Sequence, residues 1–252
     1  MAQMLAIDWD EVEVRFVLAR SEGGRLRISS AGTSPIPPDE TSEASNVAQA
    51  IQAALSGRKL GRCTVLVGLG RADLEFLTLT LPPAKEAELP DLVAHAILRQ
   101  SPHLSDGATV DFLSLNDIPT EPRVVSAAVC PAGRIERIVS CCQGAGLRTD
   151  RILVRPYALA ALLRREESLP SSSLIVCHVA DEIDFAVVSN GRVHYARTVK
   201  LPKRADEESV RERLLAEIHR TVLVASQSQA GGQTIQQIYM FGQADELVVM
   251  LL

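Results

Sequence analysis

A pattern of short strands occurs twice in this chain, and it limits the possible folds more than any other feature. Asp10–Val14 opens a segment in which apolar and polar residues alternate, and Asp181–Phe185 opens a second segment with matching residue types. Alternation with a period of two indicates half-buried strands. An apolar run precedes each segment, at Met4–Ile7 and at Leu174–Val179. We therefore expect two meanders of strands built on one plan, with chance similarity between two hairpins as the alternative.

A third strand follows in each copy. Gly24-Arg25-Leu26 matches Gly191-Arg192-Val193, and Asn190-Gly191 is typical of a type I′ hairpin turn. Further on, residues 207–227 carry apolar side chains at helical spacing before Gly231-Gly232, which predicts a long helix. A last strand is expected at Ile235–Phe241. Two halves of this kind, packed face to face, leave a cleft between them, and such a cleft is the expected ligand site.

The first meander is followed by a loop and a helix. Three prolines stand among Ser, Thr and acidic residues in Thr33–Asn46, a composition that indicates a loop. A short helix is expected over Val47–Leu55, ending near Gly57.

The middle section, about residues 62–150, has a different order of elements. The expected strands are Cys63–Val67, Leu74–Leu81, Val110–Leu115 and Val124–Val129, and the expected helices are 89–97 and Ala132–Gln143. This β-β-α-β-β-α order suits a small inserted α+β subdomain. The expected domains are residues 1–61 with 151–170 as a first half, 62–150 as the insertion, and 171–252 as an incomplete second half. The last residues, Leu247–Leu252, are an apolar run, which suggests a C-terminally truncated piece.

Composition excludes several classes of protein. Hydrophobic residues make up 46% and charged residues 23% of the 252 residues, which is typical of a soluble globular protein. Lys and Arg total 26 against 31 Asp and Glu, so general coating of nucleic acid is not expected. The first ten residues lack the basic start of a signal peptide. No apolar stretch is long enough to span a bilayer.

The cysteines indicate a reducing, cytosolic compartment. There are five, with no C-x-x-C pair, and an odd number without a pairing pattern argues against a disulfide framework. Cys141-Cys142 is interpreted as two small residues on a helix, with a redox pair as the alternative.

Several short motifs occur in a specific order along nearly the whole chain. They are Ala6-Ile7-Asp8 followed by Arg15, Leu79-Thr80-Leu81-Pro82, Val110-Asp111-Phe112, Ala127-Ala128-Val129, Ala145-Gly146-Leu147, Tyr195-Ala196-Arg197, Leu215-Ala216-Glu217-Ile218-His219-Arg220 and Tyr239-Met240-Phe241-Gly242. In order and spacing they resemble the actin-like proteins of type IV pilus assembly and type II secretion, that is, PilM-type proteins and the cytoplasmic part of GspL-type proteins. The resemblance implies an α/β, duplicated, ribonuclease-H-like fold with the middle section inserted.

The resemblance also implies a nucleotide site, since members of the pilus branch bind ATP in the interdomain cleft. If ATP binds here, the matching residues are Asp8, Arg15, Asp181 and Gly242. The two phosphate-facing turns of such a site are normally Asp-x-Gly, because glycine lets backbone N–H groups approach the phosphates.

This sequence departs from that pattern at each turn. The first turn is Asp8-Trp9-Asp10-Glu11, with Asp10 in place of glycine. The second is His178-Val179-Ala180-Asp181, with His for Asp and Ala for Gly, and the adenosine-side turn is Gly242-Gln243 where Gly-Gly is usual. Two carboxylates at the first turn would repel a triphosphate. We therefore expect no cofactor, with Mg-ATP as the alternative.

Other candidate sites are less specific. Gly144-Ala145-Gly146 lacks the third glycine and the preceding strand of a dinucleotide fingerprint, so a helix C-cap is the preferred interpretation. Gly68-Leu69-Gly70-Arg71 lacks the Lys-Ser/Thr of a phosphate loop, so a hairpin turn is preferred. The histidines have no partners at metal-ligand spacing, and no metal is expected. His178 is expected to point into the cleft, but without a nucleophile pattern nearby it is not assigned as catalytic.

Two functions remain from the sequence. The first is a non-catalytic cytoplasmic scaffold, peripheral at the inner membrane, that docks the short cytoplasmic N-terminal segment of a membrane protein or the assembly ATPase. The second is an actin-like ATP-binding protein whose nucleotide state controls partner binding. Phosphoryl transfer needs phosphate cradling, Mg²⁺ support and a positioned base. The scaffold is preferred because only Asp8 matches these needs clearly.

Overall fold

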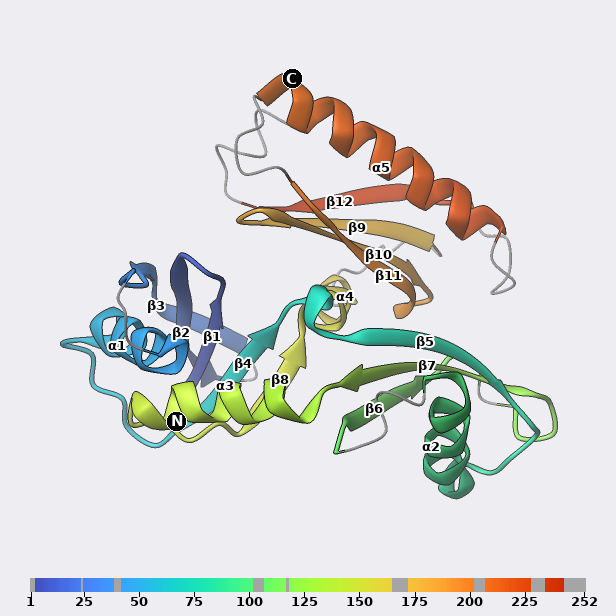
Figure 1. Cartoon of the computed structure of the whole chain (residues 1–252), viewed down its shortest axis with the longest axis horizontal. Coiled ribbons are helices and arrows are strands. Elements are labelled where there is room, and N and C mark those ends of the chain that lie inside the picture. Colours follow the sequence, from blue (N-terminus) through green and yellow to red (C-terminus); the bar gives the residue numbers. More distant parts are fainter. Residues whose placement is uncertain are drawn as a thin grey trace. The chain divides into compact units, whose positions relative to one another are not determined.

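The structure is a computed structural model, and it describes residues 3–23, 25–38, 42–101, 107–116, 118–164, 172–201, 207–227 and 234–242. The chain divides into two compact units, Met1–Leu69 with Pro131–Val154, and Gly70–Cys130 with Arg155–Leu252. Each unit has its own sheets and helices (Figure 1). The expected features at Gly231-Gly232 and Leu247–Leu252 lie outside the described residues, as do Gly24 and Gln243.

The first unit is built on a five-stranded sheet with the strand order β3-β2-β1-β4-β8. Its strands are β1 (Gln3–Trp9), β2 (Glu13–Glu22), β3 (Arg25–Pro35), β4 (Cys63–Leu69) and β8 (Arg151–Val154). The first three form an antiparallel meander, while β4 runs parallel to β1 and β8 runs parallel to β4. The predicted first meander is therefore confirmed.

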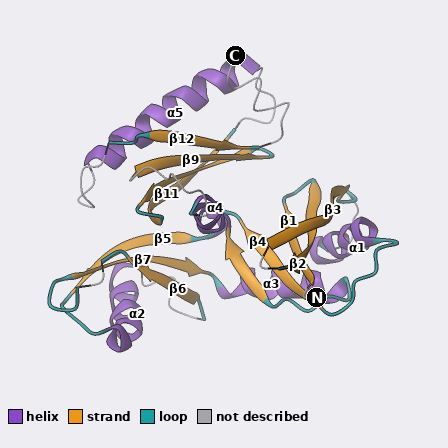
Figure 2. Ribbon diagram, turned by 180° about the vertical axis from the view of Figure 1, so that it is seen from behind, coloured by secondary structure: helices purple, strands orange, loops and turns teal. Residues whose placement is uncertain are grey.

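One face of this sheet is covered by two helices. Leu5 and Ile7 pair in register with Leu18 and Phe16, so all four side chains share a face, and all four are buried. The helices are α1 (Glu43–Leu55) and α3 (Ala132–Gly144). They pack against each other, and α1 also contacts β2 and β3 (Figure 2). The alternating apolar residues of the sequence thus lie on the helix-covered face, and the residues between them lie on the open face.

The structure corrects the predicted loop in the first unit. Strand β3 continues to Pro35, because β2 supplies a pairing partner as far as Glu13. Helix α1 begins at Glu43 rather than Val47, since the Ser42 side chain accepts a hydrogen bond from the Ser45 N–H and caps the helix start. The predicted loop Thr33–Asn46 is therefore too long at both ends.

The second unit contains a three-stranded antiparallel sheet with the order β5-β7-β6. Its strands are β5 (Glu75–Leu81), β6 (Thr109–Ser114) and β7 (Arg123–Cys130), and the short 3-10 helices η1 (Arg71–Asp73) and η2 (Glu86–Glu88) flank β5. Helix α2 (Leu89–Gln100) buries Leu89, Val93 and Ile97 against this sheet. The apolar residues of this helix recur at helical spacing, and Leu92 and Ala96 pack against the same cluster.

The middle section differs from the expected grouping in two respects. Strand β4 pairs with β1, and α3 packs on α1, so both belong to the first unit, whereas the predicted subdomain 62–150 included them. In addition, β4 and β5 lie in different sheets, so Gly68-Leu69-Gly70-Arg71 is not a hairpin turn. It leads from one sheet into η1 instead. The predicted domain boundaries stay a prediction.

The second unit also contains a four-stranded sheet with the order β11-β10-β9-β12. Its strands are β9 (Ser172–Val179), β10 (Glu182–Ser189), β11 (Arg192–Lys200) and β12 (Gln237–Phe241). The first three form an antiparallel meander, and β12 runs parallel to β9. The second predicted meander is confirmed. Its strand order matches that of the first unit, and the duplication itself stays a prediction.

Helices cover both faces of this sheet. Helix α5 (Glu207–Gln227) buries Leu214 and Ala225 on one face, together with Leu174 and Phe185 of the strands. Helix α4 (Arg155–Leu163), which the sequence did not predict, packs on the other face (Figure 2). Nearly every side chain of β9 is buried, because a strand covered on both sides cannot alternate between core and solvent.

The end of α3 confirms the predicted C-cap. Gly146 has a φ of 78°, the Gly146 N–H donates to the Gln143 carbonyl, and the Leu147 N–H donates to the Cys142 carbonyl. This pair of hydrogen bonds is a Schellman motif. Cys141 and Cys142 lie in the helix and are buried, as expected of two small helical residues.

Candidate functional site

The turn between β1 and β2 is organised by the carboxylate of Asp10. Its Oδ1 accepts hydrogen bonds from the Val12 N–H at 2.6 Å and from the Glu13 N–H at 2.9 Å. The Asp10 N–H in turn donates to the Glu13 carbonyl at 3.2 Å. An aspartate that bonds its own backbone two and three residues on is an Asx-type turn. The hairpin thus satisfies its exposed N–H groups with its own anion.

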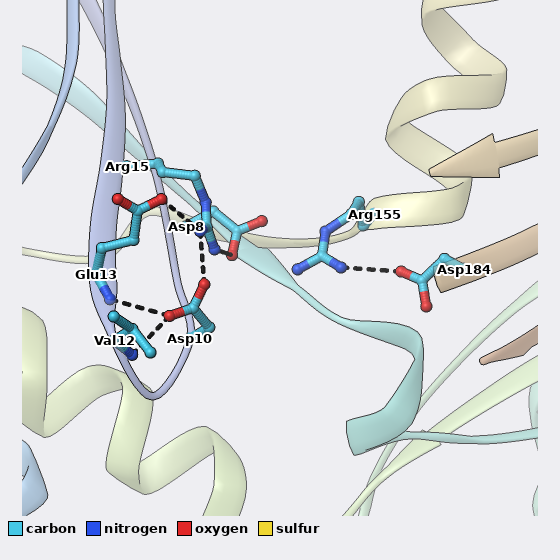
Figure 3. Close-up of polar contacts among 7 residues, drawn as sticks. All are labelled: Asp8, Asp10, Val12, Glu13, Arg15, Arg155 and Asp184. Atoms are coloured by element: carbon cyan, nitrogen blue, oxygen red, sulfur yellow. Dashed lines mark hydrogen bonds and ion pairs between the residues drawn. The ribbon is translucent and has the colours of Figure 1, made fainter. Parts of the chain in front are cut away.

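Three carboxylates surround the guanidinium of Arg15 at this turn (Figure 3). Its Nη1 lies 2.6 Å from Asp10 Oδ2 and 3.0 Å from Glu13 Oε1, and its Nη2 lies 3.6 Å from Asp8 Oδ1. The register of the sheet places Asp8 directly opposite Arg15, so both side chains are on the same face. These side chains are 18–25% exposed. The cluster is therefore partly shielded from water.

The pKa values of this cluster follow from its contacts. Burial alone would raise the pKa of the Asp10 carboxyl, but hydrogen bonds from Arg15, Glu13 and Val12 outweigh burial and lower it below its ordinary value. Burial would lower the pKa of Arg15, but the hydrogen bond to Asp10 and the charge of Asp8 raise it. Asp10 and Arg15 therefore stay charged at neutral pH.

Gly68 in β4 lies directly against Asp8. A β-carbon added at Gly68 would come within 3.0 Å of Asp8 Oδ2. The absence of a side chain at Gly68 therefore gives the Asp8 carboxylate its space. The sequence offered this glycine only as part of a turn, and its packing role depends on the parallel pairing of β1 with β4.

The turn between β9 and β10 has two residues, Ala180 and Asp181, because Val179 pairs with Glu182. Ala180 has a φ of 54°, a left-handed conformation that usually favours glycine. The Asp181 carbonyl accepts a hydrogen bond from the Leu201 N–H at 2.7 Å. His178 precedes the turn and is 9% exposed. This turn therefore adopts a tight conformation without the expected glycine.

The structure brings Gly242 close to this second turn. Phe241 of β12 pairs with Cys177 of β9, so Gly242 follows beside His178 at the same end of the sheet. Of the predicted residues, Asp8 and Arg15 therefore contact each other in the first unit, while Asp181 and Gly242 share one end of a sheet in the second.

A buried ion pair in the second unit was not predicted. Arg155 Nη1, at the start of α4, donates to Asp184 Oδ2 at 2.9 Å, and the two side chains are 12% and 3% exposed (Figure 3). Thr198 Oγ1 donates to Asp184 Oδ1 at 2.6 Å. The signal in the sequence was Asp184 itself, an acid between the apolar residues Ile183 and Phe185, but its partner could not be inferred.

Two further observations bear on chemistry. Among the residues that the structure describes, no group of three or more His, Cys, Asp or Glu side chains could hold a metal ion. Of the five histidines, His103 lies outside the described residues, while His95, His178, His194 and His219 lie within them.

No helix within the described part of the chain is long and apolar enough to cross a membrane.

Comparison with known proteins gives a consistent result for the fold. No protein-family model matches the sequence, and no curated protein matches it. Solved structures do match. A chain of the PilM-PilN type IV pilus biogenesis complex superposes with a TM-score of 0.80 at 15% identity, covering 98% of this chain and 83% of that chain. The chain has an actin-like fold.

Two other solved structures also match this chain. The cytoplasmic domain of EpsL, an inner membrane component of the type II secretion system of Vibrio cholerae, gives a TM-score of 0.59 at 12% identity, covering 96% of this chain and 86% of that one. A protein of unknown function with an actin-like ATPase fold, from Bacteroides thetaiotaomicron, gives 0.54 at 10% identity, covering 99% and 85%. The actin-like α/β fold implied by the sequence motifs is confirmed.

Proposed function

We propose that this protein is a non-catalytic scaffold of a type IV pilus or type II secretion assembly platform, with an actin-like fold whose nucleotide-binding turns are degenerate. It works on the cytoplasmic side of the inner membrane, without a membrane span of its own in the described residues. Support for this setting comes from the two structures that match best among those above. One belongs to a pilus biogenesis complex and the other to a type II secretion system.

The observation that carries the proposal is the internal anion of the first turn. In an actin-like ATP site, backbone N–H groups of this hairpin bind phosphate oxygens. Here the Asp10 carboxylate accepts from the Val12 and Glu13 N–H groups and is held by Arg15. A phosphate would have to displace an ionised side chain that is tied to its own backbone. The donors that a phosphate requires are already used.

Charge adds a second obstacle. Asp8, Asp10 and Glu13 all lie around Arg15, so one positive charge faces three carboxylates. Two like unit charges 4 Å apart repel by about 4 kcal/mol at an effective dielectric constant of 20. The negative charges of a triphosphate at this turn would be repelled by more than one of these carboxylates. The β-carbon of Ala180, at a position where a phosphate-binding turn needs glycine, opposes close approach at the second turn as well.

We infer that the protein acts by binding partners. The first partner is an inner-membrane assembly protein, recognised through a short cytoplasmic N-terminal segment, and the assembly ATPase is the second. The PilM-PilN complex supports a partner of the first kind, since a chain of that complex shares this fold. No nucleic acid is required, in keeping with the net charge of −5.

Calorimetry with Mg-ATP tests the degenerate site. The full 252-residue chain should give no binding heat, whereas micromolar binding by the unmodified protein would overturn the proposal. The variant Asp10→Gly frees the two N–H groups and removes one of the three carboxylates around Arg15, so its affinity for ATP or inorganic phosphate should rise. Glu13→Gln is the matched control, because it removes a carboxylate from Arg15 and leaves the turn amides occupied.

Deletion in the source organism tests the scaffold role. Loss of the chain should abolish pilus assembly or type II secretion. Expression of the Asp8→Asn variant in the deletion strain should restore that assembly or secretion, because a scaffold does not depend on Mg²⁺ support by this carboxylate. A deletion strain with normal pili and normal secretion would contradict the proposal.

A second candidate is an actin-like ATP-binding protein whose nucleotide state controls partner binding. One observation favours it. Asp8 stands at the usual position for Mg²⁺ support, and Gly68 gives its carboxylate space. If this candidate is right, the unmodified chain binds Mg-ATP and Asp8→Asn loses that binding.

A further inference from the structure

One edge of the first unit concentrates basic side chains, although the chain as a whole is acidic. The strands of the sheet and the loop after α1 bring together six exposed residues, which we call the basic edge: Arg20, Arg25, Arg27, Arg58, Lys59 and Arg62. Glu22 and Asp150 are acids of the same edge. The whole chain carries 31 acidic against 26 basic residues, so this local excess is not an effect of composition.

Strand pairing holds the basic edge together. Arg20 at the end of β2 pairs with Arg27 near the start of β3, and Gln3 of β1 pairs with both Arg20 and Cys63. The Gly61 N–H donates to Gln3 Oε1 at 3.3 Å, which places Arg62 beside the same row. Four strands separated by about 4.8 Å make this row about 14 Å wide.

The loop after α1 is attached to the same edge. Arg58 Nε donates to Ser30 Oγ of β3 at 3.1 Å, and Arg58 Nη1 donates to the Ala54 carbonyl at 2.6 Å. Its guanidinium also lies 4.6 Å from the centre of the Phe16 ring. The loop is therefore fixed to the sheet, and Lys59 and Arg62 extend the row of charges.

The basic edge is distant from the nucleotide-type turn. The Asp10 turn follows the end of β1, while the basic edge lies at its start. Seven strand residues at about 3.3 Å each separate the two by roughly 20 Å. A phosphate ligand of the turn therefore does not explain these charges.

Two features of the edge point to a ligand. Arg20 and Arg27 are directly opposite on neighbouring strands, where like charges are destabilising, and the Glu22 carboxylate, 4.0 Å from Arg27, offsets one of the two charges. Along β3, Leu26 and Ile28 alternate with Arg25 and Arg27 and are 49% and 65% exposed. Because neighbouring residues of a strand point to opposite faces, this end of β3 presents basic side chains on one face and exposed aliphatic ones on the other, which suits contact of the edge with an interface that has both anionic charge and hydrocarbon.

We propose that the basic edge binds the surface of a bilayer that contains anionic phospholipids. Arginine and lysine attract the negative headgroups, and Leu26 and Ile28 enter the boundary between headgroups and acyl chains. A nucleic acid offers the charge but no use for the aliphatic residues, and the low aromatic content of 4% gives bases little to stack on. The contact sets which edge of the first unit faces the membrane.

Vesicle co-sedimentation of the full chain tests this inference independently of any nucleotide or partner. The chain should sediment with vesicles of phosphatidylcholine mixed with phosphatidylglycerol, should not sediment with phosphatidylcholine alone, and should be released at high salt. Each basic residue removed should lower the partition coefficient about fivefold. Arg20→Gln combined with Arg27→Gln and Arg62→Gln should therefore lower it about 100-fold.

The control variant removes equal charge elsewhere. Lys85→Gln combined with Arg99→Gln and Arg213→Gln changes three exposed basic residues of the second unit, and its partition coefficient should stay within a few fold of the unmodified chain. Circular dichroism melting curves confirm that both variants are folded. Ile28→Ser should weaken binding without changing its salt dependence.

Three results would overturn the inference. These are equal sedimentation with neutral vesicles, equal loss in the control variant, and binding of single-stranded RNA or poly-glutamate by the basic edge with no binding of anionic vesicles. The last result assigns the edge to another macromolecule.

Discussion

The Asp10–Arg15 contact should stabilise the first unit by an amount that mutagenesis can divide into parts. Asp10→Ala removes two hydrogen bonds to backbone N–H groups and a charge-assisted bond to Arg15. A lost cap of this kind costs about 1 kcal/mol, and a partly exposed charge-assisted bond contributes about 1–2 kcal/mol. The free energy of unfolding should therefore fall by about 2–3 kcal/mol.

Asp10→Asn separates the two contributions. The amide oxygen can still accept from Val12 and Glu13, but the charge that pairs with Arg15 is gone. The loss should be about 1–2 kcal/mol, the contribution of the partly exposed charge-assisted bond. Glu13→Gln, which breaks only a partly exposed ion pair, should cost about 0.5 kcal/mol. A double-mutant cycle with Arg15→Gln measures the coupling to each carboxylate directly.

The assay is urea unfolding followed by tryptophan fluorescence. The chain has one tryptophan, Trp9, which stands next to Asp10 and reports on this hairpin. The pKa of Asp10 is lower in the folded protein than in the unfolded one. Its contribution is therefore complete above the unfolded pKa, about 3.9, and is lost as the pH falls through the folded value. The gap between the unmodified chain and Asp10→Asn should accordingly narrow in acid.

Two outcomes would refute this reasoning. If Asp10→Ala unfolds within about 0.5 kcal/mol of the unmodified chain, the internal hydrogen bonds do not hold the turn. If Asp10→Asn is as unstable as Asp10→Ala, the backbone bonds contribute nothing and only the charge matters.

Three other predictions concern the second unit and α3. Ala180→Gly should raise the free energy of unfolding by about 0.5–1 kcal/mol in thermal melts, because a left-handed φ strains an alanine; an unchanged or lower melting temperature contradicts the strain. Asp184→Asn should cost about 3 kcal/mol because Arg155 keeps a buried charge, while the control Glu182→Gln should cost little. Burial raises the pKa of Cys141 to about 11, so about one thiol in a thousand is ionised at pH 8; iodoacetamide should label it only after unfolding, and rapid labelling of the folded chain would favour the redox alternative.

Strands whose apolar and polar residues alternate could be predicted from the sequence, because this pattern does not depend on which elements pack beside the strand. This holds for the segments around Val14 and Phe185, although the second one, β10, is buried on both faces and not half-buried as expected. The sequence alone does not divide the stretch Ile152–Leu163 into a strand and a helix, because β8 and α4 are both apolar. The change from strand to helix at Arg155 can be located only once the strand pairing is known. The end of β3 at Pro35 likewise depends on a partner strand.

The candidate site was predictable in its residues but not in its bonds. Asp8 and Arg15 were named from motif positions, and their pairing across the hairpin is seen only in the structure. That Asp10 would bond the Val12 and Glu13 N–H groups could not be read from spacing, since the same residue could have pointed to solvent. Arg155 and Asp184 come from separate elements, and only the packing of α4 on its sheet brings them together.

The hairpin at Asp10 has a consequence for how the protein responds to its surroundings. A site completed by a ligand makes the folded population depend on the concentration of that ligand. This turn is completed by a residue of the same chain, at a local concentration that never changes. The folded population of this hairpin should therefore not vary with cellular ATP.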